Sequence, residues 1–355
     1  MMARVERTVR LEITGVAFGG DGIARHEGRV VFVPLAAPGD VVMAGITEER
    51  KGYLRAEILE IVTPSPERDQ PGCRYFGRCG GCCYQHLKYE SQLQIKARQV
   101  AEAFARIGKI PDAQVLPIVP SPEPYGYRNR IAVHAAGGVI GFWSRDGAAL
   151  VDIERCPISS DEVNARLSEL RARAPFEGHF SLRERGLPRS GFAQSNRFLR
   201  DGLRDAVVGA FAGGGQSLFE GYCGSGFFTE KLAQFFERVE GCDADARLMR
   251  DVPQLSNVTW RQGPVEHWLP RSKAADMLFD PPRDGLDRAI IDALVRRPPD
   301  RLVYVSCDPT TLARDASRLR GALELVSVRP FDLFPQTAQI ECVALFCRTD
   351  AGRIP

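Results

Sequence analysis

Cys307 is the residue of this chain whose type and setting most clearly indicate chemistry. It lies in the segment SCDPTTLARD (306–315), directly after an apolar run that predicts a strand. A thiol at the end of a strand is a candidate nucleophile, although a lone cysteine is about as often a buried structural residue. Asp280 ends another apolar run, and Glu341 stands at the start of a third. The thiol and the two acids together predict nucleophilic and acid–base catalysis.

A glycine-containing turn after a predicted strand indicates a cofactor site. The segment FEGYCGSGF (219–227) has Glu220 near the strand end and Gly224 in the turn, where glycine lets the backbone approach a ligand closely. Asp243 ends the next predicted strand, a position where an acid suits a ribose diol. The GxGxxG spacing of pyrophosphate-binding turns is missing. Asp243 thus favours a bound cofactor over an unliganded turn, and the missing spacing favours a cofactor without pyrophosphate. S-adenosylmethionine meets that requirement.

A group of cysteines predicts a metal site. Cys73, Cys79 and Cys82 have a spacing that suits zinc or an iron–sulfur cluster, with a fourth ligand elsewhere. Cys156, which precedes a proline, is the best candidate for that ligand. Cys83 is a rival, but adjacent cysteines rarely bind one metal site with good geometry. Ten cysteines without a secretion signal argue against disulfides. The residues alone do not decide between a zinc site, an iron–sulfur cluster and unligated thiols.

The apolar pattern predicts three domains that would position these residues. Residues 1–62 read as short strands with turns, which predicts an OB-like β-barrel. Residues 63–190 contain the cysteine group and a predicted helix near 88–108. Residues 191–355 alternate strands and helices from about 216, which predicts a doubly wound, Rossmann-like α/β domain. Its strands are expected at 217–222, 238–243, 257–260, 275–280, 301–306, 323–330 and 340–346, and helices at 227–236 and 308–320.

The last two predicted strands are joined by a short loop, which predicts one antiparallel strand at the end of the domain.

Composition excludes several classes of protein. With 44% apolar and 26% charged residues, the chain of 355 residues is neither disordered nor fibrous. No apolar run is long enough to cross a membrane, and the N-terminus lacks the run of a secretory signal, so a cytoplasmic protein is predicted. A net charge of +2 leaves a nucleic-acid partner undecided.

Three motifs resemble those of one enzyme family. DPPR (280–283), SCDPTTLARD (306–315) and FPQTAQIE (334–341) occur in the order typical of bacterial RNA 5-methyluridine methyltransferases, in particular the iron–sulfur branch that modifies 23S ribosomal RNA. The resemblance covers nearly the whole chain, with Asp308 standing where Asn is usual. It implies an RNA-binding TRAM domain over residues 3–62, a class I methyltransferase domain at the C-terminal end, and methylation of uridine C5 in RNA. It implies no protein partner.

The resemblance also implies roles for single residues. Cys307 would be the nucleophile that adds to C6 of uracil, and Glu341 the base that removes the C5 proton. Gln194, in FAQSN (192–196), would contact the uracil or the cofactor. The expected cofactor contacts are thus Gln194, Glu220, Gly224, Asp243 and Asp280. A [4Fe-4S] cluster is implied on Cys73, Cys79, Cys82 and Cys156.

Other functions stay open at this point. The enzyme could modify tRNA instead of ribosomal RNA. An amino-group methyltransferase is a weaker alternative, because Asp-Pro-Pro resembles its signature but Arg283 replaces the stacking aromatic residue. A non-catalytic RNA-binding or redox protein is another alternative. An assay for methyl incorporation into RNA separates these functions.

Overall fold

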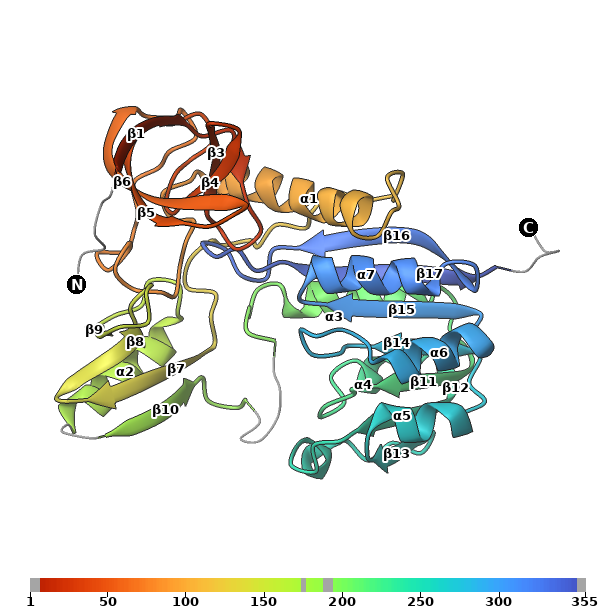
Figure 1. Cartoon of the computed structure of the whole chain (residues 1–355). Coiled ribbons are helices and arrows are strands. Elements are labelled where there is room, and N and C mark those ends of the chain that lie inside the picture. Colours follow the sequence, from red (N-terminus) through yellow and green to blue (C-terminus); the bar gives the residue numbers. More distant parts are fainter. Residues whose placement is uncertain (1–6, 174–176, 188–193, 350–355) are drawn as a thin grey trace. The chain divides into compact units, whose positions relative to one another are not determined.

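The computed structural model describes residues 7–173, 177–187 and 194–349 (Figure 1). The chain divides into two compact units. The described part of the first unit runs up to Lys96 and continues with Glu123–Glu184 and Phe334–Ala338. The second unit comprises Ala97–Pro122, Arg185–Leu333 and the residues from Gln339 on. Among the described helices, none is both long and apolar enough to cross a lipid bilayer.

The N-terminal part of the first unit is a six-stranded sheet in the order β1-β5-β6-β4-β3-β2 (Figure 1). Its neighbouring strands are antiparallel except β4 and β6, which are parallel. Buried aliphatic residues such as Val31, Val42 and Leu54 form its core. Whether the sheet has the OB topology stays a prediction. The strands are β1 (Arg7–Glu12), β2 (Gly15–Val16), β3 (Gly22–His26), β4 (Arg29–Val33), β5 (Val41–Glu49) and β6 (Tyr53–Thr63).

The remainder of the first unit contains a four-stranded antiparallel sheet in the order β10-β7-β8-β9. One of its faces packs on helix α2 through Val163 and Leu167 of the helix. The helix predicted near 88–108 is confirmed as α1, which continues into the second unit. The elements are α1 (Tyr89–Arg106), β7 (Arg130–Ala136), β8 (Val139–Trp143), β9 (Leu150–Asp152), α2 (Asp161–Ala172) and β10 (Gly178–Arg183).

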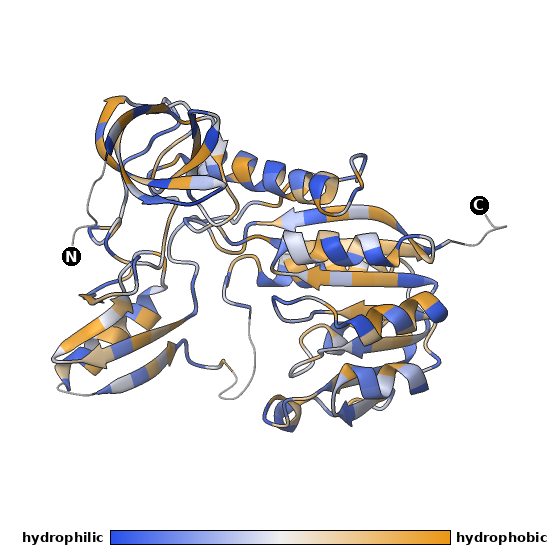
Figure 2. Ribbon diagram, viewed as in Figure 1, coloured by the Kyte–Doolittle hydropathy of each residue, from blue (hydrophilic) through white to orange (hydrophobic). Residues whose placement is uncertain are grey.

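The second unit is built on a seven-stranded sheet in the order β13-β12-β11-β14-β15-β17-β16. Strand β17 is antiparallel to both of its neighbours and the other pairs are parallel, which confirms the predicted antiparallel strand. Strands β14 and β15 are almost entirely buried and largely apolar (Figure 2). The strands are β11 (Gly215–Gly221), β12 (Phe236–Asp243), β13 (Val258–Gln262), β14 (Asp276–Phe279), β15 (Arg301–Ser306), β16 (Leu323–Phe331) and β17 (Glu341–Arg348).

The helices of this unit follow the predicted alternation only in part. The helix expected at 308–320 is confirmed as α7, but the one expected at 227–236 is wrong in extent, since α4 has four residues. It ends early because Phe236 already belongs to β12, where it pairs with Gly215 of β11. The elements are α3 (Arg200–Ala210), α4 (Thr229–Leu232), η1 (Leu248–Asp251), α5 (Val265–Trp268), η2 (Leu269–Arg271), α6 (Arg288–Arg296) and α7 (Pro309–Leu319).

The predicted division into residues 1–62, 63–190 and 191–355 stays a prediction. Its second boundary falls within residues 188–193, outside the described part of the chain. The first lies at the end of β6, which closes the six-stranded sheet. For the functional site, the important feature is that β11, β12, β14 and β15 are parallel, because their carboxyl ends then share one edge of the sheet.

Candidate active site

A cavity of about 490 Å³ lies in the second unit at the carboxyl ends of its parallel strands. Its volume is within the roughly 300–1,000 Å³ of small-molecule sites. It is lined by side chains and turns that follow β11, β12, β14 and β15, together with the first residue of β17. Most residues predicted for catalysis or cofactor binding line this cavity: Gln194, Gly224, Asp243, Asp280, Cys307 and Glu341.

The turn after β11 forms one wall of the cavity. Gly224 has a φ of +57°, in the left-handed region that glycine adopts without steric strain. Its N–H donates to Oδ2 of Asp243 at 2.9 Å, and the other carboxylate oxygen of Asp243 accepts from the N–H of Asp245 at 2.8 Å. Tyr222 also has a positive φ, +61°, which is uncommon for a residue with a side chain and typical of functional turns. Asp243 thus fixes the turn while it lines the cavity.

Glu220 is the predicted cofactor residue that is not among the lining residues. Its side chain is buried in β11, and its carboxyl accepts a hydrogen bond of 2.5 Å from Oγ1 of Thr229 at the start of α4. Burial, the largest cause, and the carboxylates of Asp280 and Asp243 together raise the pKa of Glu220 to about 8, although the hydrogen bond from Thr229 lowers it. Glu220 therefore connects β11 to the start of α4, and its contact with a cofactor stays a prediction.

Gln194 lines the cavity with only 3% of its surface exposed. The neighbouring residues of its motif, Phe192 and Ala193, lie outside the described part of the chain. Asn196, two residues later, is buried and donates through Nδ2 to Oγ of Ser121 at 2.9 Å and to the carbonyl of Leu333 at 3.2 Å. The end of this motif is thereby fixed, which holds the backbone next to Gln194.

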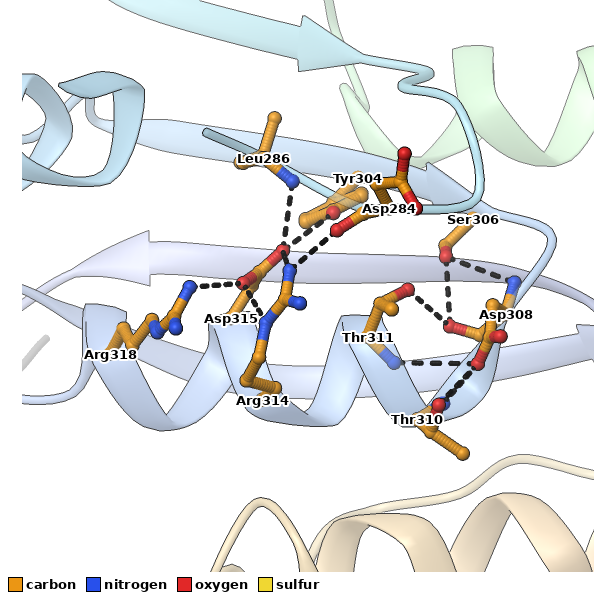
Figure 3. A network of polar contacts seen from close by, with 10 residues as sticks. All are labelled: Asp284, Leu286, Tyr304, Ser306, Asp308, Thr310, Thr311, Arg314, Asp315 and Arg318. Atoms are coloured by element: carbon orange, nitrogen blue, oxygen red, sulfur yellow. Dashed lines mark hydrogen bonds and ion pairs between the residues drawn. The ribbon is translucent and has the colours of Figure 1, made fainter. Parts of the chain in front are cut away.

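Cys307 is positioned by the junction between β15 and α7. Asp308 is the N-cap of α7, and its carboxylate accepts from the N–H of Thr310 at 2.8 Å (Figure 3). Ser306 accepts from the N–H of Asp308 through Oγ at 3.2 Å. Asn and Asp cap helices equally well, so Asp308, where the family usually has Asn, still caps α7. These bonds present the thiol at the N-terminal end of a helix, which favours a thiolate.

Burial and neighbouring charges act on the thiol in opposite directions. Burial, the largest cause, and the Glu341 carboxylate together raise the pKa of Cys307 to about 11, although Arg283 lowers it. Glu341 is 5% exposed, and burial and the charge of Asp280 hold the pKa of its carboxyl well above the usual range, while Arg283 again opposes the shift. Burial also raises the pKa of Asp280. A nucleophile, two acids and a cation thus influence one another within a single cavity.

Arg283 is a functional residue to which sequence reasoning gave no role. In the sequence it is only the last residue of the DPPR motif and an argument against an amino-group methyltransferase, yet it lines the cavity and favours the charged forms of both Cys307 and Glu341. A guanidinium keeps its charge at every accessible pH. The DPPR motif could have indicated this role, because two prolines restrict the backbone directly before Arg283 and so define the position of its side chain.

A second missed residue, Asp315, connects the DPPR segment to the helix after Cys307. Asp315 is fully buried in α7, and its Oδ2 accepts from the N–H of Leu286 at 2.9 Å and from the hydroxyl of Tyr304 at 3.0 Å (Figure 3). Arg314 donates to the carbonyl of Asp284 at 2.7 Å. Gly285 lies between these bonds with a φ of +79°, and a Cβ there would be 2.5 Å from Oδ2 of Asp315. The network fixes the loop after Arg283 relative to α7.

Residues 334–338, the first part of the FPQTAQIE motif, belong to the first unit and form hydrogen bonds there. Gln92 donates through Nε2 to Oε1 of Gln336 at 3.0 Å and accepts from the N–H of Gln336 at 2.9 Å. The N–H groups of Cys83 and Tyr84 both donate to the carbonyl of Gln336. Gln336 has a φ of +69°, so this tight backbone conformation is held by four hydrogen bonds, only a few residues before Glu341.

The four predicted metal ligands line a separate cavity of about 210 Å³ in the first unit. Burial, the largest cause, and the neighbouring thiols of Cys156, Cys79 and Cys73 together raise the pKa of Cys82 to about 12, although a hydrogen bond with Gln85 lowers it. Cys83 does not line this cavity; it packs with Ala338. In the described residues, no group of three or more His, Cys, Asp or Glu side chains is arranged so that it could hold a metal ion.

Comparison with known proteins matches both ends of the chain to family models. Residues 3–59 match the TRAM domain, and residues 268–349 match the tRNA (Uracil-5-)-methyltransferase family. An RNA methyltransferase of Bdellovibrio bacteriovorus is 32% identical, and the match covers 95% of this chain and 94% of the relative. One from Gloeobacter violaceus is 31% identical, with 97% of each protein covered.

Two further proteins are named for their substrate. A tRNA (uracil(54)-C(5))-methyltransferase of Schizosaccharomyces pombe is 29% identical over 94% of this chain and 77% of its own length. The crystal structure of the Pyrococcus abyssi tRNA (uracil-54, C5)-methyltransferase in complex with S-adenosyl-L-homocysteine superposes with a TM-score of 0.72. That match covers 95% of this chain and all of the other at 23% identity, so it establishes the fold.

Proposed function

The chain belongs to the family of S-adenosylmethionine-dependent RNA (uracil-5-)-methyltransferases, and we propose that it methylates a uridine of ribosomal RNA through a covalent bond between Cys307 and C6 of the base. The observation that carries the proposal is the single cavity lined by Cys307, Glu341 and the turn around Gly224. A nucleophile, a base and a glycine turn for a cofactor are the parts that this chemistry requires.

The proposed mechanism follows from the low reactivity of C5 of uracil. The Cys307 thiolate adds to C6, and the electron pair of the C5–C6 double bond gives C5 the character of an enolate carbon. S-adenosylmethionine, when bound, supplies an electrophilic methyl group. Glu341 then removes the C5 proton, the double bond re-forms, and the C6–S bond breaks to release Cys307 as a thiolate. Arg283 supports these steps because it favours the charged forms of both residues.

The residues proposed to contact the cofactor are Gln194, Gly224, Asp243 and Asp280. Glu220 is proposed to contribute through the turn that follows β11. Asp243 suits the ribose hydroxyls because it lines the cavity and because each of its carboxylate oxygens, which accepts one backbone hydrogen bond, can accept another. The carboxylates around the site also suit a sulfonium cation. A positive charge in the cavity would lower the raised pKa values of Asp280 and Glu341 and so favour their ionised forms.

We propose a [4Fe-4S] cluster on Cys73, Cys79, Cys82 and Cys156. The proposal is supported by the four cysteines lining one cavity of about 210 Å³, because a cluster would need its four thiolates spread around a common space. A single zinc ion would instead draw four ligands to about 2.3 Å from one point. The bound iron would be structural, since methyl transfer to C5 moves no net electrons.

Protein purified without oxygen should contain iron and sulfide and should absorb broadly near roughly 400 nm. Replacing Cys156 with serine should remove most of the iron, because it removes one of the four ligands. The matched control is Cys83→Ser, which should keep the metal because Cys83 packs outside the cavity. Stoichiometric zinc without iron in anaerobic preparations would contradict the cluster.

The choice of RNA is tested by mapping 5-methyluridine in RNA from cells with and without the protein. We expect one uridine of ribosomal RNA to lose its methyl group when the protein is absent. Transfer RNA is the second candidate substrate, favoured by the names of the S. pombe and P. abyssi proteins. Loss of 5-methyluridine only from tRNA would overturn the ribosomal assignment and leave the enzyme class intact. Loss from neither RNA would overturn the proposed function.

A further inference from the structure

The outer face of the four-stranded sheet in the first unit has an unusual composition. Along β7, Ile131 and Val133 are buried in the core shared with α2, so the alternate residues Arg130 and His134 lie on the opposite face of the strand. On β10, Phe180 packs against the same core. The register of β10 and β7 then gives the outer face exposed rings and cations, where an ordinary solvated sheet face would have mixed charges.

Three rings form a row across three neighbouring strands. His179 of β10 lies directly opposite His134 of β7, with ring centroids 4.9 Å apart. The ring of His134 lies 5.5 Å from that of Trp143 on β8. Trp143 is 46% exposed, although indole rings are usually well buried. Adjacent rings at this spacing offer flat surfaces on which further planar groups can stack.

Arginines continue the same face. Arg130 lies directly opposite Arg183 in the pairing of β7 with β10, an arrangement that destabilises a sheet when both residues carry like charge. Arg128 approaches as well, since its Nε donates to the carbonyl of Arg130 at 3.0 Å. Burial lowers the pKa of Arg130, and the charges of Arg183 and Arg128 lower it further. These guanidinium groups at one end of the face suit contacts with phosphates.

The backbone of the row is held by the cysteine loop. The N–H of Gly80 donates to the carbonyl of Trp143 at 3.0 Å, and the N–H of Arg145 donates to the carbonyl of Arg78 at 3.0 Å. Cys79 forms an isolated bridge with Ser144. The backbone at Trp143 and just after it is thus hydrogen-bonded to the loop that contains two of the proposed cluster ligands, which holds this end of β8 in place.

We propose that this outer face, formed by His179, His134, Trp143, Arg130 and Arg183, binds a single-stranded segment of the substrate RNA. Unpaired bases stack on the row of rings, and phosphates contact the arginines. Charge complementarity selects a polyanion as the occupant, and the rings select one with exposed flat bases. The inference rests on the proposed function, which identifies the bound RNA as the substrate. The face itself is a binding surface that does not include the residues of the catalytic cavity.

The test compares variants of the full chain in their affinity for a labelled RNA that contains an unpaired loop. Trp143→Ala should weaken binding about ten-fold or more, the size expected for one lost base stack, whereas Trp143→Phe should stay close to wild type. Phe235→Ala is the matched control, since Phe235 is 47% exposed on the second unit and lies outside the active-site cavity. Arg130→Ala should reduce the slope of log affinity against log salt by about one.

The outcomes separate this inference from the proposed function. At saturating RNA, Trp143→Ala should keep the wild-type rate of methylation and its affinity for S-adenosylmethionine, so the defect appears in KM and not in kcat. If wild-type protein binds the loop RNA but methylates none, the proposed function fails and the binding face stands. If Trp143→Ala binds as tightly as wild type, or loses affinity for fully duplex RNA to the same extent, base stacking on this face is refuted.

Discussion

Replacing Cys307 with alanine should abolish methyl transfer, with a loss of at least about a thousand-fold in single-turnover rate. Without the thiolate no adduct forms at C6, and C5 never becomes nucleophilic enough to attack a methyl group. The fold should be kept, because the backbone at this position is held by Asp308 as the N-cap of α7 and by Ser306, not by the thiol. The measurement is transfer of labelled methyl from S-adenosylmethionine to RNA, made beside a binding assay for the cofactor.

Cys347→Ala is the matched control for this variant. Cys347 is a partly exposed thiol on β17 of the same unit, and it does not line the cavity, so its loss should leave the rate near wild type. Methylation of RNA by the Cys307→Ala protein would contradict the covalent mechanism. Direct transfer to a nitrogen atom would then be the better interpretation.

The high pKa of Cys307 shapes how this reaction depends on pH. Burial and Glu341 keep the thiol protonated near neutral pH in the free protein, so only a small fraction is thiolate. Arg283 counteracts this, and a bound sulfonium would do so too. The apparent kcat/KM should therefore rise with pH through the neutral range, since it follows the thiolate fraction of the free enzyme.

That the candidate site residues lie together could be predicted from the sequence, because each one stands at an end of a predicted strand. Cys307 and Asp280 follow apolar runs that became β15 and β14, and in a parallel sheet such ends meet at one edge. Asp315 could not be predicted in this way. Asp315 accepts a hydrogen bond from the N–H of Leu286, 29 residues earlier in the chain, and no local sequence pattern indicates that partner.

The elements that sequence analysis missed are those whose stability comes from distant contacts. Strand β3 (GIARH) contains glycine and two polar residues and forms only because it pairs with β4. Helix α2 has a charged sequence in which Val163 and Leu167 are the main core contacts. The row of His179, His134 and Trp143 depends on the register of three strands, which a single sequence does not determine.

Glu341→Gln should produce a different failure from that of Cys307→Ala. The glutamine keeps the shape of the buried carboxyl and cannot accept the C5 proton, so addition and methylation should proceed while elimination stalls. The substitution suits the fold, because burial and Asp280 already favour the neutral form of Glu341. The variant should therefore accumulate a protein–RNA complex joined through Cys307 and carrying the methyl group. Denaturing gel electrophoresis with labelled S-adenosylmethionine should reveal a slow, RNase-sensitive labelled band.

Two controls decide whether that band reports the proposed base. The double variant Cys307→Ala with Glu341→Gln should give no band, because the bond to C6 requires the thiol. Glu324→Gln, on β16 and away from the cavity, should turn over like wild type without trapping RNA. Normal turnover by Glu341→Gln would assign proton removal to another group, and Asp280 would be the first candidate, since it lines the same cavity and burial raises its pKa. A covalent band without label would instead mean that Glu341 acts before methyl transfer, when C5 attacks the donor.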